Sequence, residues 1–175
     1  EVDAAGLPTG MLIDNAMGAL AVLATAPSET QIDETYEKGA ARELSLGWTG
    51  VHSMSVPGSH VSRINALSDA GKLNLRIYNA VDDKDFDATL AGGLFGQTSD
   101  GLVTTKAVKL YMDGALGSRG ALLSEPYSDR PDISGLEIAQ EEPTLALMKK
   151  AYDANIQVCF HAIGDRGNQL VLDWM

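Results

Sequence analysis

The segment VKLYMDG, residues 108–114, alternates apolar residues with side chains that can do chemistry. Side chains alternate between the two faces of a β-strand, so one face of this segment carries an ammonium, a phenol and a carboxylate, from Lys109, Tyr111 and Asp113. A parallel strand that is covered on both sides is normally apolar on both faces. The polar face therefore indicates a functional cavity next to this strand.

Burial of an unpaired charge costs several kcal/mol, so a buried Lys109 needs compensation. Three forms of compensation are open. The lysine can form an ion pair with Asp or Glu, or it can act as a base with a lowered pKa. Its neutral amine can also react with carbon dioxide, which gives a carbamate, an anionic oxygen ligand that bridges two divalent metals.

The segment IQVCFHAI, residues 156–163, repeats this arrangement on the next predicted strand. Alternation places His161 on the face opposite to Phe160, close to the end of the strand. A neutral imidazole is a common zinc ligand, and a hydrogen-bonded core histidine is the alternative. Cys159 is the single cysteine of the chain, which excludes a disulfide within it and a cysteine-based zinc cluster.

Further candidates for substrate contacts, or for holding metal ligands in place, lie close to the strands: His52, Tyr111, Asp113, Arg119 and Asp165. Arg119 belongs to the glycine-rich segment DGALGSRG, residues 113–120, and is suited to bind a substrate carboxylate. Asp165 has an alternative role, because a carboxylate in the first turn of a helix interacts favourably with the helix dipole by ~0.3–1 kcal/mol. We interpret the glycine-rich segment as a loop with positive φ angles, and a phosphate-binding loop is its alternative.

Four apolar segments that read as buried strands position these residues: 48–56, 73–81, 107–114 and 156–163. The first predicted helix begins at Asp33 as the N-cap, and the second covers 60–70 with Gly71 as the stop. Further helices are predicted near 85–91, from Pro143 to Asn155, and after Gly164. This alternation predicts βα units around a parallel sheet. Polar groups at the C-terminal ends of the strands favour a (β/α)₈ barrel over a doubly wound sheet, and four units make a partial barrel.

The expected organisation is a single partial barrel domain over residues 1–175, in which residues 1–32 lead into the βα units of 33–175. The chain starts without methionine and stops at Trp174-Met175, inside a predicted helix. We therefore expect it to be an internal segment of a longer protein.

The charge of the chain disfavours nucleic acid as a partner. With 13 basic and 24 acidic residues, the formal net charge is −11 at pH 7. Nucleic acids are bound by clustered lysine and arginine, which this composition does not supply.

No segment reaches the ~18 consecutive apolar residues that suggest a membrane span. The cellular compartment stays open.

Four segments carry a resemblance to a known family: PTGML at 8–12, GWTGVHSM at 47–54, VKLYMDGALGSRGALLSEPYSD at 108–129 and HAIGDRGNQLVLD at 161–173. Together they resemble the metal-dependent amidohydrolase superfamily, and within it amidohydrolase family 3, which includes N-substituted formamide deformylase-like enzymes. The resemblance implies an eight-stranded barrel that hydrolyses a carbon–nitrogen bond in a small amide-like substrate. The four predicted strands would then be strands two to five.

The resemblance also implies a metal centre. Family members hold divalent metal, zinc in our expectation, with an HxH pair on strand one, an often carbamylated lysine on strand four, histidines on strands five and six, and an aspartate on strand eight. Lys109 matches the strand-four lysine and His161 the strand-five histidine. No HxH pair occurs in this chain, and Ser53 stands where relatives often have Asp after the histidine. The strand-eight aspartate, which is the usual general base, would lie outside these 175 residues.

We therefore expect a fragment of a carbon–nitrogen hydrolase that is inactive by itself. The alternative is a non-catalytic binding or assembly module derived from half a barrel. Its open sheet edges and uncovered interior face predict self-association, or completion by the missing barrel segments.

Overall fold

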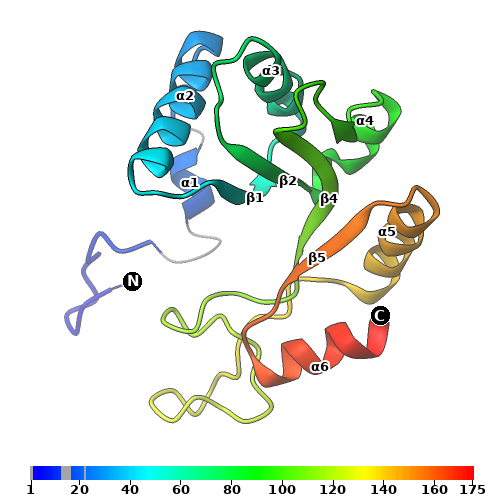
Figure 1. Ribbon diagram of the computed structural model, residues 1–175. Helices are drawn as coiled ribbons and strands as arrows, with labels where there is room; N and C mark the ends of the chain where they lie inside the picture. Colours follow the sequence, from blue (N-terminus) through cyan, green and yellow to red (C-terminus); the bar gives the residue numbers. More distant parts are fainter. Residues whose placement is uncertain (1, 13–16, 22) are drawn as a thin grey trace. The chain divides into compact units, whose positions relative to one another are not determined.

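The computed structural model describes residues 2–12, 17–21 and 23–175, and it divides into two compact units (Figure 1). Unit 1 joins the described residues up to Ala26 with Tyr111–Gln140 and His161–Met175. Unit 2 joins Pro27–Leu110 with Glu141–Phe160. The predicted single domain over residues 1–175 remains a prediction.

Unit 2 is built on a β-sheet whose long strands follow one another in space as β1, β2 and β4. Strand β1 (Gly50–Val56) pairs in parallel with β2 (Arg76–Asp82), which pairs in parallel with β4 (Val103–Tyr111). Strand β5 (Gln157–His161) also pairs with β4, and the two-residue strand β3 (Gly96–Gln97) runs antiparallel to the start of β4. The parallel core of the sheet confirms the predicted order of strands.

Helices alternate with the strands, as the sequence pattern predicts. They are α1 (Gly18–Ala21), α2 (Glu29–Ser45), α3 (Gly58–Asp69), the 3₁₀ turn η2 (Asp83–Asp85), α4 (Phe86–Ala91), α5 (Glu141–Asp153) and α6 (Asp165–Trp174). Helix α3 follows β1, α4 follows β2, α5 follows β4 after a long loop, and α6 follows β5 (Figure 1). Among the described residues, no helix has the length and apolar character that crossing a membrane requires.

The core of unit 2 lies between the sheet and the helices. One cluster joins side chains of α2 and α3 to the strands: Ala40, Val56, Val61, Ile64, Leu67, Leu73, Leu75, Ile77, Val81 and Val103. A second cluster surrounds Phe86 and contains Val108, Leu110, Ala151 and Ile156. Strand β4 contributes to both clusters, and its residues from Ala107 to Leu110 are all buried. Lys109 therefore lies in a central strand, as the sequence predicts.

Two strand predictions need correction. Strand β4 begins at Val103, four residues earlier than expected, because Val103, Thr105 and Ala107 are buried one after another on a single face. It also ends at Tyr111, so the placement of Asp113 within the strand is wrong. The chain turns away after Met112, and the carboxylate of Asp113 binds backbone groups of other segments.

The predicted start of helix α2 at Asp33 is wrong. Ser28 is the N-cap: its hydroxyl accepts the Gln31 N–H at 3.3 Å, and the Gln31 side chain accepts the Ser28 N–H at 2.8 Å. This reciprocal pair is a capping box, which satisfies two backbone donors that a helix leaves open. Asp33 accepts hydrogen bonds from Arg63 of α3 instead, at 2.7 and 2.9 Å.

Replacing Ser28 by alanine is expected to lower the free energy of unfolding by about 1 kcal/mol, because the cap on α2 is lost. Urea denaturation followed by circular dichroism measures the change. Ser45→Ala is the matched control at the other end of the same helix, where the hydroxyl donates to the Arg42 carbonyl. This control should change the free energy of unfolding by less than about 0.5 kcal/mol. Equal effects of the two substitutions would contradict the capping account.

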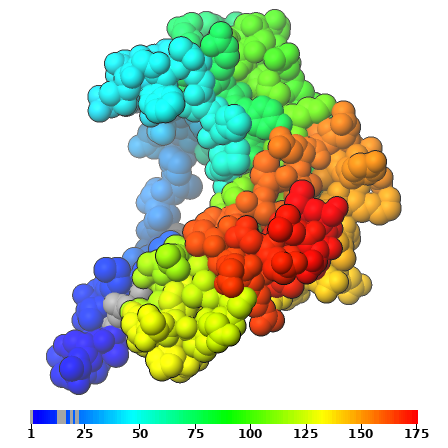
Figure 2. All heavy atoms as spheres, turned by 60° about the horizontal axis from the view of Figure 1, so that its bottom comes forward, coloured from blue at the N-terminus to red at the C-terminus, as the bar shows by residue number. Residues whose placement is uncertain are grey.

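Unit 1 consists largely of turns arranged beside helix α6. The long loop after β4 folds back on itself, because the Gly114 N–H donates to the Gly120 carbonyl at 3.0 Å and the Gly120 N–H donates to the Ala115 carbonyl at 2.8 Å. The Tyr127 hydroxyl is buried and donates to the Ala121 carbonyl at 2.8 Å. In the space-filling view the loop, in green and yellow, lies against the start of α6, in red (Figure 2).

Candidate metal and substrate site

The carboxylate of Asp113 is buried in unit 1 and accepts several backbone hydrogen bonds. It is 1% exposed, and it accepts backbone N–H groups of Leu122 at 2.9 Å, Ile163 at 3.0 Å and Gly164 at 2.7 Å. These donors belong to the loop after β4 and to the turn after β5. Because buried backbone donors need partners, this one carboxylate holds both segments in place.

His161 is the last residue of β5 and lies next to Asp113. Its Nε2 atom is 3.7 Å from the Asp113 Oδ1 atom, and its backbone carbonyl accepts the Met112 N–H at 2.8 Å. The imidazole ring is 5.6 Å from the Tyr111 ring, centre to centre. The structure thus brings together three residues that the sequence analysis singled out: Tyr111, Asp113 and His161. Their roles remain predictions.

Two glycines make this arrangement possible. Gly164 is the N-cap of α6 and has an ordinary φ of −66°, but a Cβ atom there would overlap the backbone of Leu122. At Gly167, a Cβ atom would lie 2.9 Å from the Asp113 Oδ2 atom. Gly164 therefore allows close approach to the Leu122 backbone, and Gly167 leaves room for the Asp113 side chain. The sequence pattern did not predict these roles.

Asp165 and Arg119 both have partners within unit 1. Asp165 lies in the first turn of α6 and accepts the Ser124 N–H at 3.0 Å. Hydrogen bonding from Ser124, by its side chain and its backbone, lowers the pKa of Asp165. Arg119 donates to Asp129 at 2.6 Å, and this hydrogen bond is the main reason that the pKa of Asp129 is lowered. A substrate carboxylate would have to compete with Asp129 for Arg119.

Lys109, in unit 2, is 9% exposed. Burial lowers the pKa of its amine, and the nearby Cys159 thiol raises it to a smaller extent. Burial likewise raises the pKa of the half-buried Cys159 thiol, which lowers its share of reactive thiolate. The Cα atom of Lys109 is in register with Asp82 at the end of β2. A lowered pKa makes the neutral amine more accessible, which both the base and the carbamate interpretations require.

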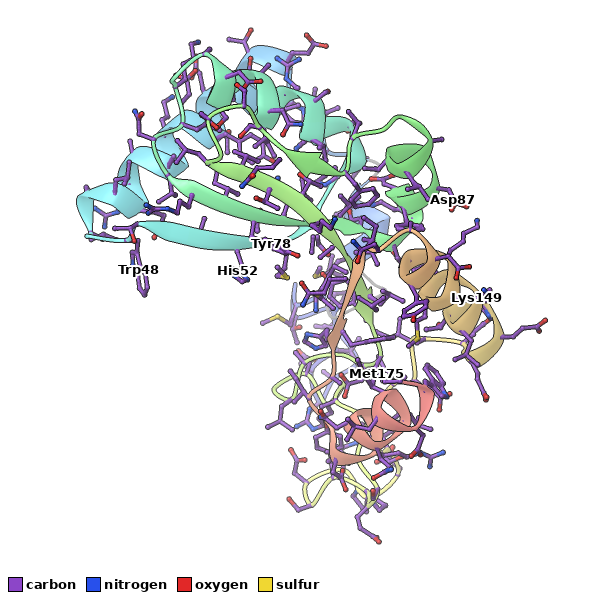
Figure 3. All side chains as sticks on the ribbon, turned by 45° about the vertical axis from the view of Figure 1, so that its right-hand side comes forward. Trp48, His52, Tyr78, Asp87, Lys149 and Met175 are labelled. Atoms are coloured by element: carbon purple, nitrogen blue, oxygen red, sulfur yellow. The ribbon has the colours of Figure 1, made fainter. Side chains whose placement is uncertain are left out.

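His52 lies in unit 2, within strand β1. It is the third of the seven residues of this strand, which continues to Val56. Its ring is 5.3 Å from that of Tyr78, whose hydroxyl donates to Gln157 at 2.8 Å. Figure 3 shows His52 and Trp48 projecting from the sheet on the side away from helix α2.

A pocket of about 620 Å³ surrounds His52 at the N-terminal ends of the strands. Its lining includes Trp48, Gly50, His52, Arg76, Tyr78, Gln97 and Thr104. Active sites of βα barrels lie at the opposite, C-terminal ends of the strands. The location of this pocket therefore argues against its being the active site, whatever its volume.

The described residues supply some of the side chains that could bind a metal, but not a complete ligand set. Within the described residues, no three of His, Cys, Asp and Glu lie close enough together to hold a metal ion. Two positions nevertheless have suitable chemistry, the imidazole of His161 and the buried amine of Lys109 with its lowered pKa. Their roles as metal ligands remain predictions, each residue taken by itself.

The chain is similar in sequence and in fold to known hydrolases. The sequence model of the amidohydrolase family matches residues 1–174. The protein YtcJ of Bacillus subtilis (strain 168) is 32% identical over 176 residues, which cover 98% of this chain and 33% of YtcJ. A crystal structure of a metal-dependent hydrolase from Pyrococcus horikoshii OT3 matches 91% of this chain and 32% of its own, with a TM-score of 0.81 and 30% identity.

A second crystal structure, of a metal-dependent hydrolase from Pyrococcus furiosus, gives a TM-score of 0.80 and 27% identity. It covers 91% of this chain and 33% of that one. The chain thus spans about a third of the length of the relatives it matches. The matches confirm the predicted fold class, an α/β fold that forms part of a (β/α)₈ barrel.

Proposed function

Because this chain belongs to the amidohydrolase family, we propose that it is part of a metal-dependent hydrolase that cleaves non-peptide carbon–nitrogen bonds in small amide-like substrates. The observation that carries the proposal is the buried amine of Lys109, whose pKa is lowered by burial, on the strand that pairs with the strand ending in His161. By itself the chain is expected to be inactive, because two donors do not make a catalytic metal centre.

The proposed role of Lys109 is that of a carbamate ligand. Its neutral amine attacks carbon dioxide, a nitrogen–carbon bond forms, and the amine proton is released to solvent. The product exchanges a costly buried cation for anionic oxygens, which divalent metals bind well. Support comes from the burial of Lys109 and from its lowered pKa, because only the uncharged amine can react.

The proposed role of His161 is that of a neutral imidazole ligand at the end of β5. Within unit 2, the side chain of Cys159 interacts electrostatically with Lys109. Strand alternation puts Cys159 and His161 on the same face of β5. That Lys109 and His161 serve one metal centre is proposed from their match to the strand-four lysine and the strand-five histidine of the family.

When bound, a divalent metal, zinc in our proposal, supplies a Lewis acid beside the scissile carbonyl and makes a water molecule more acidic. The residues of this chain would bind and orient. Arg119 and Asp165 are proposed substrate contacts at the loop and at the start of α6, and Tyr111 packs beside the imidazole of His161. The proposed general base is an aspartate outside these 175 residues.

The alternative, a non-catalytic assembly module, finds support in the sheet edge. Strand β1 pairs with β2 and ends the strand order β1-β2-β4-β3, and such an edge can pair with another strand. Self-association, or completion by further barrel segments, therefore remains part of our proposal.

Carbon-13 NMR with labelled bicarbonate and zinc tests the role of Lys109. The wild-type chain is expected to give a protein-bound carbamate signal, and Lys109→Met should abolish it. Because burial disfavours the ammonium, this substitution should change the free energy of unfolding by less than about 1 kcal/mol. Lys106→Met, at a half-buried lysine of the same strand, is the control and should keep the signal.

Two results would contradict this role. A signal that persists in Lys109→Met would assign the carbamate to another amine. A destabilisation of about 3–5 kcal/mol in Lys109→Met, without any carbamate signal in the wild type, would indicate a buried structural ion pair instead.

A further inference from the structure

We propose that Asp113 is a positioning residue that fixes the imidazole of His161 and the glycine-rich loop as one rigid group. The inference rests on the proposed function in one respect, namely that His161 is a metal ligand. Its structural basis lies entirely within unit 1.

Asp113 holds several backbone groups from two segments of unit 1. Three backbone N–H groups donate to a carboxylate that is 1% exposed. One donor, Leu122, belongs to the loop after β4, and the other two, Ile163 and Gly164, follow His161 directly. Hydrogen bonds to a carboxylate are stronger than those between neutral groups, so the turn after His161 is anchored to the loop through this side chain.

The imidazole of His161 is held by neighbours on more than one side. The backbone of His161 is fixed by the hydrogen bond from Met112 at 2.8 Å, its ring packs beside Tyr111, and its Nε2 atom faces the Asp113 Oδ1 atom at 3.7 Å. A protonated Nε2 would face a carboxylate oxygen favourably, whereas a lone pair there would face another lone pair. At 3.7 Å the two atoms lie beyond hydrogen-bond distance, so Asp113 acts on the imidazole through the turn that follows His161.

The loop that follows the glycine-rich segment is bonded to Asp113 and to helix α6. The Gly167 N–H donates to the Leu122 carbonyl at 3.1 Å, and the Leu122 N–H donates to Asp113. Both backbone groups of Leu122 are thus hydrogen-bonded, the carbonyl to Gly167 and the N–H to Asp113. Within the loop, Gly114 and Gly120 also lie close together, since a Cβ atom at Gly120 would lie 3.0 Å from the Gly114 Cα atom. A change in the loop reaches His161 through Asp113.

NMR of the metal-free 175-residue chain tests the inference, and the presence of only three histidines simplifies assignment. In the wild type we expect exchange of the Leu122, Ile163 and Gly164 amides to be slowed about 100-fold or more. We also expect a nuclear Overhauser contact between the rings of His161 and Tyr111. In Asp113→Asn these amides should exchange about tenfold faster or more, and the ring contact should disappear.

Asp132→Asn is the matched control, because Asp132 is an exposed carboxylate of the same unit that binds Arg130. It should leave both the amides and the ring contact unchanged. Should Asp113→Asn not fold, Asp113→Ser is the second variant and is read in the same way, since its hydroxyl keeps one acceptor.

A variant in which the amides open while the His161 ring keeps its contact would overturn the inference, because Asp113 would then be only a loop anchor. Fast exchange of the three amides in the wild type would overturn it as well. These measurements use no metal. If zinc binding were unchanged after removal of the His161 imidazole, the proposed function would fail. The NMR results on Asp113 would still hold, so the two failures can be distinguished.

Discussion

Replacing Gly164 by alanine is expected to lower the free energy of unfolding by about 3 kcal/mol or more, at the upper end of what overpacking costs. The φ angle of −66° suits any residue, so the effect does not come from backbone strain at position 164. It comes from space, because the new methyl group would overlap the backbone of Leu122. Backbone atoms cannot turn aside as a flexible side chain can, and moving Leu122 breaks its hydrogen bond to Asp113.

Gly117→Ala is the matched control, because a Cβ atom at Gly117 would have no other atom within 4 Å. It belongs to the same loop and should change the free energy of unfolding by less than about 0.5 kcal/mol. Urea denaturation of both variants measures the difference. A Gly164→Ala variant with the stability of the wild type would show that the turn after β5 does not approach Leu122 as described.

Replacing His161 by asparagine is expected to weaken zinc binding by on the order of 100-fold, because loss of a ligand should cost at least as much as loss of the groups that orient one. Competition with a zinc indicator measures the affinity of the 175-residue chain. His52→Asn is the control: it removes an exposed imidazole from the same chain and should leave the affinity unchanged.

Equal losses of affinity in the two variants would mean that zinc binds histidine without regard to its place in the fold. A loss of zinc affinity in His52→Asn alone would assign the metal to the pocket that surrounds His52. Either result would contradict the role of His161.

The order of strands and helices could be predicted because it depends on local patterns. Apolar runs of strand length alternate with helical periodicity from residue 33 onward, and the structure confirms both. Strand β3 was missed because two residues carry no periodicity. The start of α2 was misplaced although the signal was present, since serine at position 28 and glutamine at position 31 have capping-box spacing.

The candidate site could be predicted only in part, for a similar reason. The sequence pattern correctly predicted that Lys109 is buried and that His161 lies at a strand end, whereas Asp113 lies beyond the end of β4. The partners of Asp113 could not be predicted, because backbone N–H groups occur at every residue except proline and leave no mark in a sequence. The available signal was indirect, in the two glycines that make room for the approach, Gly164 and Gly167.

The decisive measurement is a titration of the isotopically labelled chain with cobalt(II), followed by NMR. A paramagnetic ion broadens the signals of nearby nuclei, even when it binds weakly. We predict that signals around Lys109 and around His161 broaden together, with the same midpoint, while those around His52 persist. If the two residues shape one metal centre, neither can respond without the other. Broadening at only one of them, or first at His52, would contradict the account.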